Sequence, residues 1–392
     1  MDKKDFENSL TRQARDTEKM VRVVFDSVTA QLGQTLTTKE VFDAQKIFIT
    51  GCGDSWLAGV ACKAAFESIT KVETHVMRAV EFSRHLNGKN LGYSPNTPMV
   101  LVISYSGEAT RAVECALRAT ERGANTIAIT NDPNSRLAKA CRHTVCVGLP
   151  EGGEYFPGGT TYIASMTALM LIAMRVGRIR ETISGETYLD MRQALLDYAH
   201  DFQKEVEGYT DRAFALAQTW KDLRAEDFIG DYSDYATAFF GSAKIIETFG
   251  GYTTYDDSED WCHINYFLKD PASIGTVIMA DKNSLAYGRE KETAASAAAI
   301  GRPVLVVTNG PREDFPGAQV VCCVPEAPAG YEWLLPLTDY IPASLLAGYI
   351  AQLQQEPFFR FARLADDTPD PNSDFANRGC MTLSNSKVEI YD

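Results

Sequence analysis

The chain has 392 residues, of which 45% are hydrophobic and 23% are charged, values typical of a globular protein large enough for two domains. Its formal net charge is −14 and its lysines and arginines are not clustered, which argues against a nucleic-acid partner and against an anionic membrane surface. Nine cysteines without a CxxC motif predict neither a disulfide framework nor a zinc site, but reduced and mostly buried thiols of a cytoplasmic protein.

The N-terminal segment, residues 1–34, is predicted to be one leading helix. Apolar side chains recur at helical spacing between residues 21 and 32, so we expect a single long helix over residues 5–33. The first residues are charged and contain no apolar core, so no secretory signal is expected. The longest strongly apolar run, residues 163–174, is too short to span a bilayer.

A first domain is predicted over residues 35–182, where short apolar segments alternate with helical patterns. This alternation is typical of an open parallel sheet covered by helices on both faces. The expected strands are 46–50, 72–77, 99–103, 126–130 and 144–147, and the expected helices are 56–69, 79–86, 108–122 and 160–176.

Two turns rich in glycine and hydroxyl residues follow predicted strands of this domain, at residues 51–55 and 104–110. Free backbone N–H groups and the positive end of a helix dipole favour an anion at such a turn, most often a phosphate. Because neighbouring parallel strands end at one edge of a sheet, both turns are expected to surround one ligand. Taken alone, Ser104 and Ser106 are as compatible with ordinary turn and N-cap residues.

The second half of the chain is predicted to repeat the first. Residues 183–222 form a helical connector, with its helix over 185–220, and residues 223–356 again alternate between strand and helix patterns. The last segment, 357–392, contains prolines and no helical pattern, so it is expected to be an irregular tail laid over the active site. The expected strands of the second half are 227–230, 274–280, 303–308 and 319–324, and its helices are 235–249, 287–300 and 333–354.

Several of these segments carry the motifs of a known family. Residues 104–108 are similar to the start of a Ser-x-Ser-Gly-Glu-Thr phosphate loop, residues 51–55 to a Gly-x-Gly-Thr-Ser turn, and residues 241–247 to a Gly-Ala-x-Lys-x-x-Glu helix. On these motifs the chain resembles the double SIS (sugar isomerase) domain proteins, in particular the isomerase half of glucosamine-6-phosphate synthase and the fructosamine-6-phosphate deglycases. The resemblance implies an α/β fold with two tandem SIS domains, each a flavodoxin-like three-layer αβα sandwich around a parallel sheet.

The resemblance implies that the first domain binds the sugar phosphate. Position 109 is Ala where the family has Thr, so Thr110 takes that place one step later, and Asp54 stands where the family has Thr before Ser55. The residues implied to contact the substrate or its phosphate in this domain are Ser55, Glu81, Ser104, Tyr105, Ser106, Thr110 and Thr160.

The second domain is implied to carry the catalytic pair. His263 follows Glu247 by sixteen residues, which is also the spacing of the family's catalytic Glu and His. A carboxylate can carry a proton between C1 and C2 of a sugar, and an imidazole of near-neutral pKa can assist ring opening. As isolated residues, Glu247 would more often be a solvated side chain and His263 a satisfied core histidine.

Two lysines are further candidates. Lys244 shares a helix face with Glu247, and it either orients that carboxylate or binds a substrate hydroxyl, or it forms a surface ion pair of little energetic consequence. The resemblance implies that Lys387 opens or holds the sugar, through an imine or by neutralising an enolate, and a solvated lysine is the alternative.

Four acidic residues precede His263 and suggest a divalent metal, but their spacing fits no known type of site. We therefore expect a polar loop that shapes substrate specificity, with neither a metal nor a cofactor. These residues are Asp256, Asp257, Glu259 and Asp260.

Three functions remain open from the sequence. The leading hypothesis is a fructosamine (Amadori) 6-phosphate deglycase that acts by 1,2 proton transfer and imine hydrolysis, since no glutaminase segment is expected to supply ammonia. The alternatives are an aldose–ketose or amino-sugar 6-phosphate isomerase or deaminase, and a non-catalytic sugar-phosphate sensor. The resemblance also implies a cytoplasmic homodimer with the site at the subunit interface, and neither the sugar nor the amine can be read from the sequence.

Overall fold

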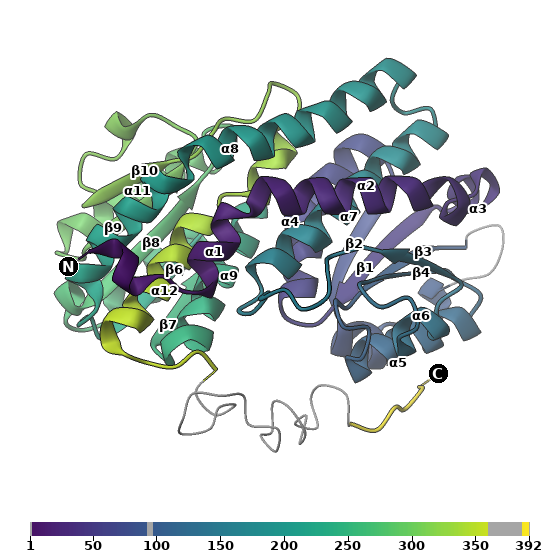
Figure 1. The fold of residues 1–392 in the computed structure, drawn as a ribbon, viewed down its shortest axis with the longest axis horizontal. Helices are drawn as coiled ribbons and strands as arrows, with labels where there is room; N and C mark the ends of the chain where they lie inside the picture. Colours follow the sequence, from purple (N-terminus) through teal and green to yellow (C-terminus); the bar gives the residue numbers. More distant parts are fainter. Residues whose placement is uncertain (1, 92–96, 360–385, 392) are drawn as a thin grey trace. The chain divides into compact units, whose positions relative to one another are not determined.

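The computed structural model describes residues 2–91, 97–359 and 386–391, which form two compact units. Each unit contains one parallel five-stranded sheet with helices packed beside it (Figure 1), which confirms the predicted α/β fold with two sheets. The β6–β10 unit comprises Met1–Glu18, Glu154–Thr160 and Asp197–Arg363, and the β1–β5 unit comprises Lys19–Gly153, Thr161–Leu196 and Leu364–Asp392.

The sheet of the β1–β5 unit has the strand order β2-β1-β3-β4-β5, and all of its strands are parallel. Its interior strands are continuous apolar runs because helices cover both faces of the sheet. The five predicted strands are confirmed with small shifts at their ends. The elements are β1 (Lys46–Gly51), α4 (Asp54–Thr70), β2 (Glu73–Arg78), β3 (Met99–Ile103), α5 (Thr110–Glu121), β4 (Asn125–Thr130), α6 (Arg136–Ala140), β5 (His143–Cys146) and α7 (Gly159–Ile179).

The sheet of the β6–β10 unit has the order β10-β9-β8-β6-β7, so β6 to β10 occupy the places of β1 to β5 in turn. This equivalence confirms the predicted structural repeat. The elements are β6 (Ala225–Ile229), α9 (Ser233–Phe249), β7 (Tyr252–Asp256), α10 (Ser258–His263), β8 (Ile274–Ala280), α11 (Tyr287–Ala299), β9 (Val304–Thr308), β10 (Val320–Cys323) and α12 (Ile341–Gln354).

The single N-terminal helix expected over residues 5–33 is wrong, because the segment is divided into three pieces. Asn8 accepts hydrogen bonds from the backbone of Leu10 and Thr11 and starts a new helix with a capping box. Asp16 then leaves helical geometry, with ψ near 6°. The pieces are a 3₁₀ turn (Lys3–Phe6), α1 (Ser9–Arg15) and α2 (Thr17–Thr35).

Other differences involve short or exposed elements, whose sequence signals are weak. Strand β7 was not predicted because it lies at the sheet edge and most of its side chains are not buried. The helix expected over 79–86 is a π-helical turn (Glu81–His85), and the one expected over 333–354 is a 3₁₀ segment (Glu332–Leu337) followed by α12, which has Pro342 in its first turn. The short helices α3 (Thr38–Asp43), α6 and α10 were missed, whereas the connector helix α8 (Gly185–Trp220) is confirmed.

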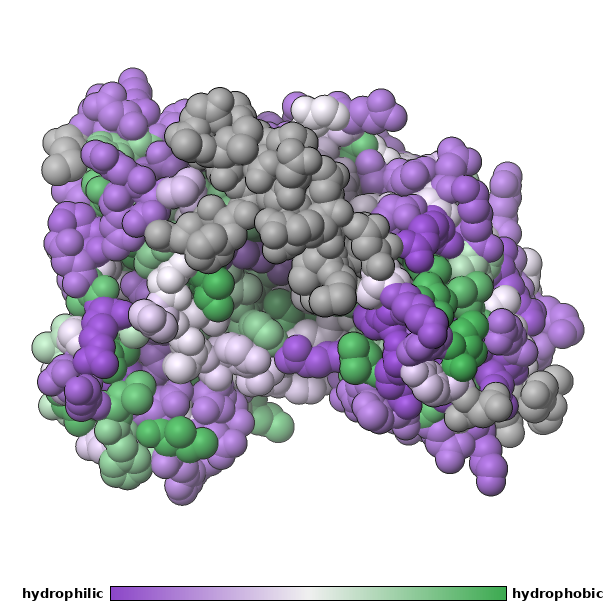
Figure 2. All heavy atoms as spheres, turned by 90° about the horizontal axis from the view of Figure 1, so that it is seen from below, coloured by the Kyte–Doolittle hydropathy of each residue, from purple (hydrophilic) through white to green (hydrophobic). Residues whose placement is uncertain are grey.

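Two described helical segments, Gly159–Ile179 and Glu332–Gln354, are long and apolar enough to cross a membrane by composition alone. The run at residues 163–174, expected to be too short to span a bilayer, lies within the first of these helices. Of their apolar windows, 83% and 100% are buried within the protein, as in core helices. The face shown in Figure 2 is mostly hydrophilic, with hydrophobic residues in separate patches. The eight described cysteines are all free, and only three of them, Cys62, Cys115 and Cys322, are buried.

Candidate functional site

The two predicted anion-binding turns lie next to each other in the β1–β5 unit. Strands β1 and β3 pair in parallel, and the register places Gly51 opposite Ile103, so both turns leave the sheet at the same level. Gly51 leaves room for this approach, because a Cβ there would lie 3.0 Å from the carbonyl oxygen of Ile103. The turns lead into α4 and α5, whose first backbone N–H groups have no partner within the helix.

Backbone hydrogen bonds hold the turn after β3 in a defined shape. The N–H of Ser104 donates to Ile129 at 3.0 Å, and the N–H of Asn131 donates to the carbonyl oxygen of Tyr105 at 2.8 Å. Ser104 is almost fully buried, Tyr105 is half-buried, and Ser106 is exposed and accepts from the N–H of Glu108 at 3.2 Å. The serines thus do act as turn residues, and the turn is rigid enough to present a fixed set of polar groups.

Thr110 is the first residue of α5 and is fully buried, and its hydroxyl oxygen has no hydrogen-bond partner among the described residues. A buried hydroxyl without a partner costs free energy, so its presence is consistent with a ligand that completes it. Ser55 lies in the first turn of α4, where its N–H donates to the carbonyl oxygen of Cys52 at 3.1 Å.

Gly107 provides a stability test of this turn. Its φ is +67°, and a Cβ would lie only 2.1 Å from Ser135 Oγ, so Gly107→Ala is expected to cost about 1–3 kcal/mol of unfolding free energy and to weaken binding of inorganic phosphate. Gly152→Ala is the matched control, because its φ is +75° but no atom lies within 4 Å of the added Cβ. Urea unfolding and calorimetric titration measure both effects. Equal losses in the two variants would contradict the role of the close approach at Gly107.

Glu81 and Thr160 lie in different surroundings from the two turns. The exposed Glu81 lines a cavity of about 470 Å³ along the open edge of β2, together with Lys46, Lys63 and His75. Thr160 belongs to the β6–β10 unit, where it is buried and its N–H donates to Gln13 of α1 at 2.7 Å. No described contact joins either residue to residues 51–55 or 104–110, and their roles stay predictions.

Lys244 and Glu247 form a close ion pair on α9. The Nζ of Lys244 lies 2.5 Å from Oε2 of Glu247, and the lysine side chain is fully buried whereas that of Glu247 is 30% exposed. The ammonium also lies 4.2 Å from the ring centroid of Phe240. The surface ion pair considered for these residues is therefore wrong, because a buried cation holds a carboxylate that remains partly open to solvent.

His263 is the last residue of α10 and is exposed, so the satisfied core histidine considered for it is also wrong. Its Nε2 lies 3.1 Å from Oε1 of Glu259, and that carboxylate also pairs with Arg289 at 2.7 Å. Both side chains of the histidine pair are more than half exposed, so solvent screens the interaction. The imidazole is thus accessible and loosely held by its own partner.

A buried ion pair fixes the segment that carries His263. Asp227 of β6 binds Arg302 at 2.7 Å, and both side chains are essentially inaccessible. Asp227 also accepts hydrogen bonds from Trp261 Nε1 and from Asn265 Nδ2, the latter at 3.1 Å, so the residues two before and two after His263 are tied to one carboxylate. Arg302 in turn donates to the carbonyl oxygen of Asn265. The backbone around His263 is therefore anchored to the sheet even though its side chain is mostly exposed.

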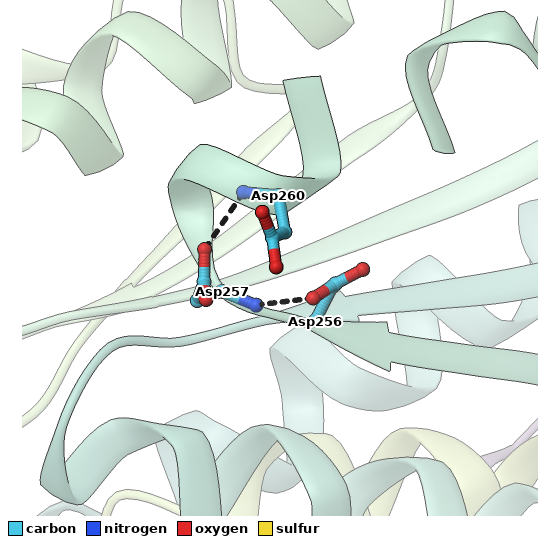
Figure 3. A group of neighbouring side chains, drawn as sticks. All are labelled: Asp256, Asp257 and Asp260. Carbon is cyan, nitrogen blue, oxygen red and sulfur yellow. Dashed lines mark hydrogen bonds between the residues drawn. The ribbon is translucent and has the colours of Figure 1, made fainter. Parts of the chain in front are cut away.

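The acidic residues before His263 gather at the start of α10 (Figure 3). The carboxylate oxygens of Asp256, Asp257 and Asp260 lie within 4.8 Å of one another. Asp257 accepts from the N–H groups of Glu259 and Asp260 and thereby caps the helix, and Asp256 accepts from the N–H of Asp257 at 3.0 Å. Capping explains this arrangement, so the cluster supports no metal assignment.

The end of the chain binds the β1–β5 unit through three arginines. The buried carboxylate of Glu114 accepts from Arg84 at 2.9 Å, from Arg111 at 2.6 Å and from the N–H of Glu389 at 2.8 Å. Burial would raise the pKa of Glu114, but these hydrogen bonds outweigh it and hold the pKa below its usual value. Beside this cluster, Arg118 donates to the carbonyl oxygen of Tyr391 at 2.8 Å. Residues 386–391 are thus attached at α5, the helix that begins at Thr110.

Lys387 lies within this attached segment, while most of the predicted tail falls outside the described residues. Its Nζ lies 2.8 Å from Oε1 of Glu389, and this partner raises the pKa of Lys387 above its usual value. A protonated lysine is not a nucleophile, so this arrangement fits an electrostatic role better than imine formation. The role of Lys387 stays a prediction.

Apart from Glu81, Thr160 and Lys387, the predicted site residues thus fall into two groups. Ser55, Ser104, Tyr105, Ser106 and Thr110 lie on adjacent turns of the β1–β5 unit, and Lys244, Glu247 and His263 lie in the β6–β10 unit. Sequence reasoning missed the Asp227–Arg302 pair and the arginines that bind the C-terminal segment, since charges paired in three dimensions leave no local pattern.

Comparison with known proteins agrees with this architecture. Residues 40–175 match the model of the SIS domain family. The chain is 27% identical over 316 residues to a glutamine–fructose-6-phosphate aminotransferase (isomerizing) of Bacteroides thetaiotaomicron, an alignment that covers 80% of this chain and 49% of that protein. The chain therefore spans about half the length of this relative.

Solved structures show the same fold. The C-terminal domain of glucosamine-fructose-6-phosphate aminotransferase from Francisella tularensis superposes with a TM-score of 0.77 at 17% identity, over 92% of this chain and 99% of that one. A glucosamine-6-phosphate deaminase from Thermotoga maritima superposes with a TM-score of 0.63 at 15% identity, over 89% and 95% of the two chains. Residues 40–175 are thus similar to the SIS domain family, both sheets of the chain share the fold of these solved structures, and the sequence is similar to the part of the glutamine–fructose-6-phosphate aminotransferases that it spans.

Proposed function

We propose that this protein is a sugar-phosphate-processing enzyme that uses Glu247 as its general base. The observation that carries the proposal is the contact of 2.5 Å between the buried Lys244 and the partly exposed Glu247. A cation at this distance stabilises the ionised carboxylate, which is the form that accepts a proton. The hydroxyl-lined turns 51–55 and 104–110 supply the groups for a phosphate, and the homologous aminotransferases are named for fructose 6-phosphate.

The finer proposal is a fructosamine 6-phosphate deglycase. Glu247 removes a proton from C1 of the open-chain ketoamine while the C2 carbonyl oxygen takes up a proton, which gives an enaminol. Glu247 then returns its proton to C2 and the nitrogen loses its own, so the C–N single bond at C1 becomes an imine and C2 bears a hydroxyl. Water adds to the imine, the C–N bond breaks, and the products are an aldose 6-phosphate and a free amine. His263, whose imidazole is exposed, assists ring opening by moving a proton at the ring oxygen.

A substrate panel tests this assignment. The protein is incubated separately with a fructosamine 6-phosphate, fructose 6-phosphate and glucosamine 6-phosphate, and free amine and aldose phosphate are measured. Release of amine from the fructosamine alone is the expected result. Turnover of fructose 6-phosphate or glucosamine 6-phosphate instead would identify an isomerase or deaminase. No turnover, with ligand-dependent thermal stabilisation that survives Glu247→Gln and His263→Ala, would identify a sensor.

We further propose a cytoplasmic homodimer with the site at the subunit interface. An exposed apolar run, Ile264, Tyr266, Phe267 and Leu268, directly follows His263, and exposed apolar patches commonly mark interaction surfaces. Light scattering coupled to size exclusion tests the oligomeric state, and a monomeric mass at working concentrations would contradict the dimer.

A further inference from the structure

The turn after β6 repeats the geometry of the anion-binding turn after β1. The N–H of Ser55 donates to the carbonyl oxygen of Cys52 at 3.1 Å, and the N–H of Asp234 donates to that of Asp231 at 2.9 Å. The residue preceding each helix has the same unusual backbone, with φ +53° in both turns and ψ of −128° and −110°. Asp231 and Asp234 therefore occupy the positions of Cys52 and Ser55.

The turn after β8 repeats the one after β3 in the same way. The N–H of Gly107 donates to the carbonyl oxygen of Ser104 at 2.9 Å, and the N–H of Ser284 donates to that of Asp281 at 2.9 Å. In each turn the residue that accepts the hydrogen bond directly follows the strand. Asp281 therefore stands where the first repeat has Ser104. Asp234 and Asp281 thus put carboxylates where the first repeat has the hydroxyls of Ser55 and Ser104, so these two turns repel a phosphate.

Helix α11 adds a further carboxylate beside these two turns. Glu290 lies in the first half of α11 and is completely buried, and both of its carboxylate oxygens lack a hydrogen-bond partner. One carboxylate oxygen of Asp231, Oδ2, is also buried without a partner, and this side chain is close enough to Glu290 to share a hydrogen bond if one of the two is protonated. Three orphan oxygens from two elements therefore face each other.

These carboxylates have no cationic partner among the residues that the structure describes. In the described part of the chain, no lysine, arginine or histidine forms an ion pair with Asp231, Asp234, Asp281 or Glu290. Burial and the neighbouring Asp231 raise the pKa of Glu290 to about 9, and burial together with nearby carboxylates raises the pKa of Asp234. Buried carboxylates must gain a counter-charge or a proton, because an isolated buried charge is too costly.

We propose that the turn after β6 and helix α11 together hold a hard divalent cation. Its ligands are the orphan oxygens of Asp231 and Glu290. All the facing side-chain groups are oxygens, which suits calcium or magnesium and disfavours metals that prefer sulfur or nitrogen. The cation joins α11 to the residues that start α9, and α9 carries Lys244 and Glu247. The first repeat thus binds an anion and the second binds a cation at equivalent turns.

Thermal unfolding of the whole chain tests the site. The protein is treated with a chelator, desalted, and melted with calcium alone, magnesium alone or neither. At a cation concentration about 100-fold above the Kd, the midpoint of the wild-type protein is expected to rise by about 5 °C. Glu290→Gln is expected to abolish this rise and to increase the midpoint without cation, since its amide can donate to Asp231. Glu226→Gln is the matched control. Glu226 is also a buried glutamate of this unit, but it lies on strand β6, four residues before Gly230, and so belongs neither to the turn after β6 nor to α11.

Two further variants keep the test decisive. Asp231→Asn replaces Glu290→Gln if the Glu290 variant does not fold. In addition, calorimetric titration of the wild-type protein with the cation should give one ion per chain. Asp260→Asn should retain the response, because Asp260 belongs to the separate acidic cluster at the start of α10. A rise that persists in the Glu290 and Asp231 variants, a rise lost only in Asp260→Asn, or no rise with either ion would overturn the proposal. If neither ion raises the midpoint, protons rather than a cation neutralise the carboxylates of Asp231 and Glu290.

Discussion

Glu247→Gln is expected to lower turnover by about 10²–10⁴-fold, the range that a positioned general base contributes. The glutamine keeps the shape of the side chain, and its amide oxygen can still accept the hydrogen bond that Lys244 donates at 2.5 Å. It cannot accept a proton from a carbon acid at neutral pH. Single-turnover and steady-state assays on the substrate found in the panel measure the loss, and calorimetry measures binding of the same sugar phosphate.

The control for this variant is Glu313→Gln, which changes an exposed glutamate in the same unit. It is expected to keep full turnover. Sugar-phosphate affinity of Glu247→Gln should remain within a few-fold of wild type, because the turns proposed to bind the phosphate lie in the other unit. Retained turnover in Glu247→Gln would remove this residue as the base, whereas a parallel loss of turnover and thermal stability would indicate a structural role.

Asp227→Asn is expected to cause the largest loss of stability, about 3–5 kcal/mol of unfolding free energy, because it breaks a fully buried ion pair and leaves Arg302 uncompensated. The change also weakens hydrogen bonds to Trp261 and Asn265, the two residues that flank His263. Urea unfolding measures the loss. Turnover, measured where the variant is fully folded, should fall as well, because the segment around His263 is no longer held.

Asp270→Asn is the matched control for this prediction. Asp270 also pairs with an arginine, Arg224 at 3.3 Å, but both side chains are at least 60% exposed. An exposed pair contributes only about 0–1 kcal/mol, so this variant should unfold close to wild type. If the two aspartate variants lost the same stability, burial of the Asp227–Arg302 pair would not be the source of the effect.

The ordering of the elements was predictable from the sequence because it depends on local patterns. Buried parallel strands such as Met99–Ile103 and Ile274–Ala280 are apolar runs with clear ends, and long helices such as Gly185–Trp220 repeat apolar residues every turn. Strand β7 and helix α10 escaped prediction because one is an exposed edge strand and the other is a single capped turn. The N-terminal helix was divided by Asn8 and Asp16, whose capping competes with helix continuation.

The sequence by itself determined the fold class, the internal repeat and the residue types of the candidate site, since each is written in spacing and composition. Only the tertiary structure decided that Lys244 is buried, that His263 is exposed, and that Asp227 with Arg302 holds the backbone on either side of His263 to the sheet. It also decided that Glu290 faces Asp231 across two elements far apart in the chain. The physical reason is that burial and charge pairing depend on which segments meet in space, and no local window of sequence contains both partners.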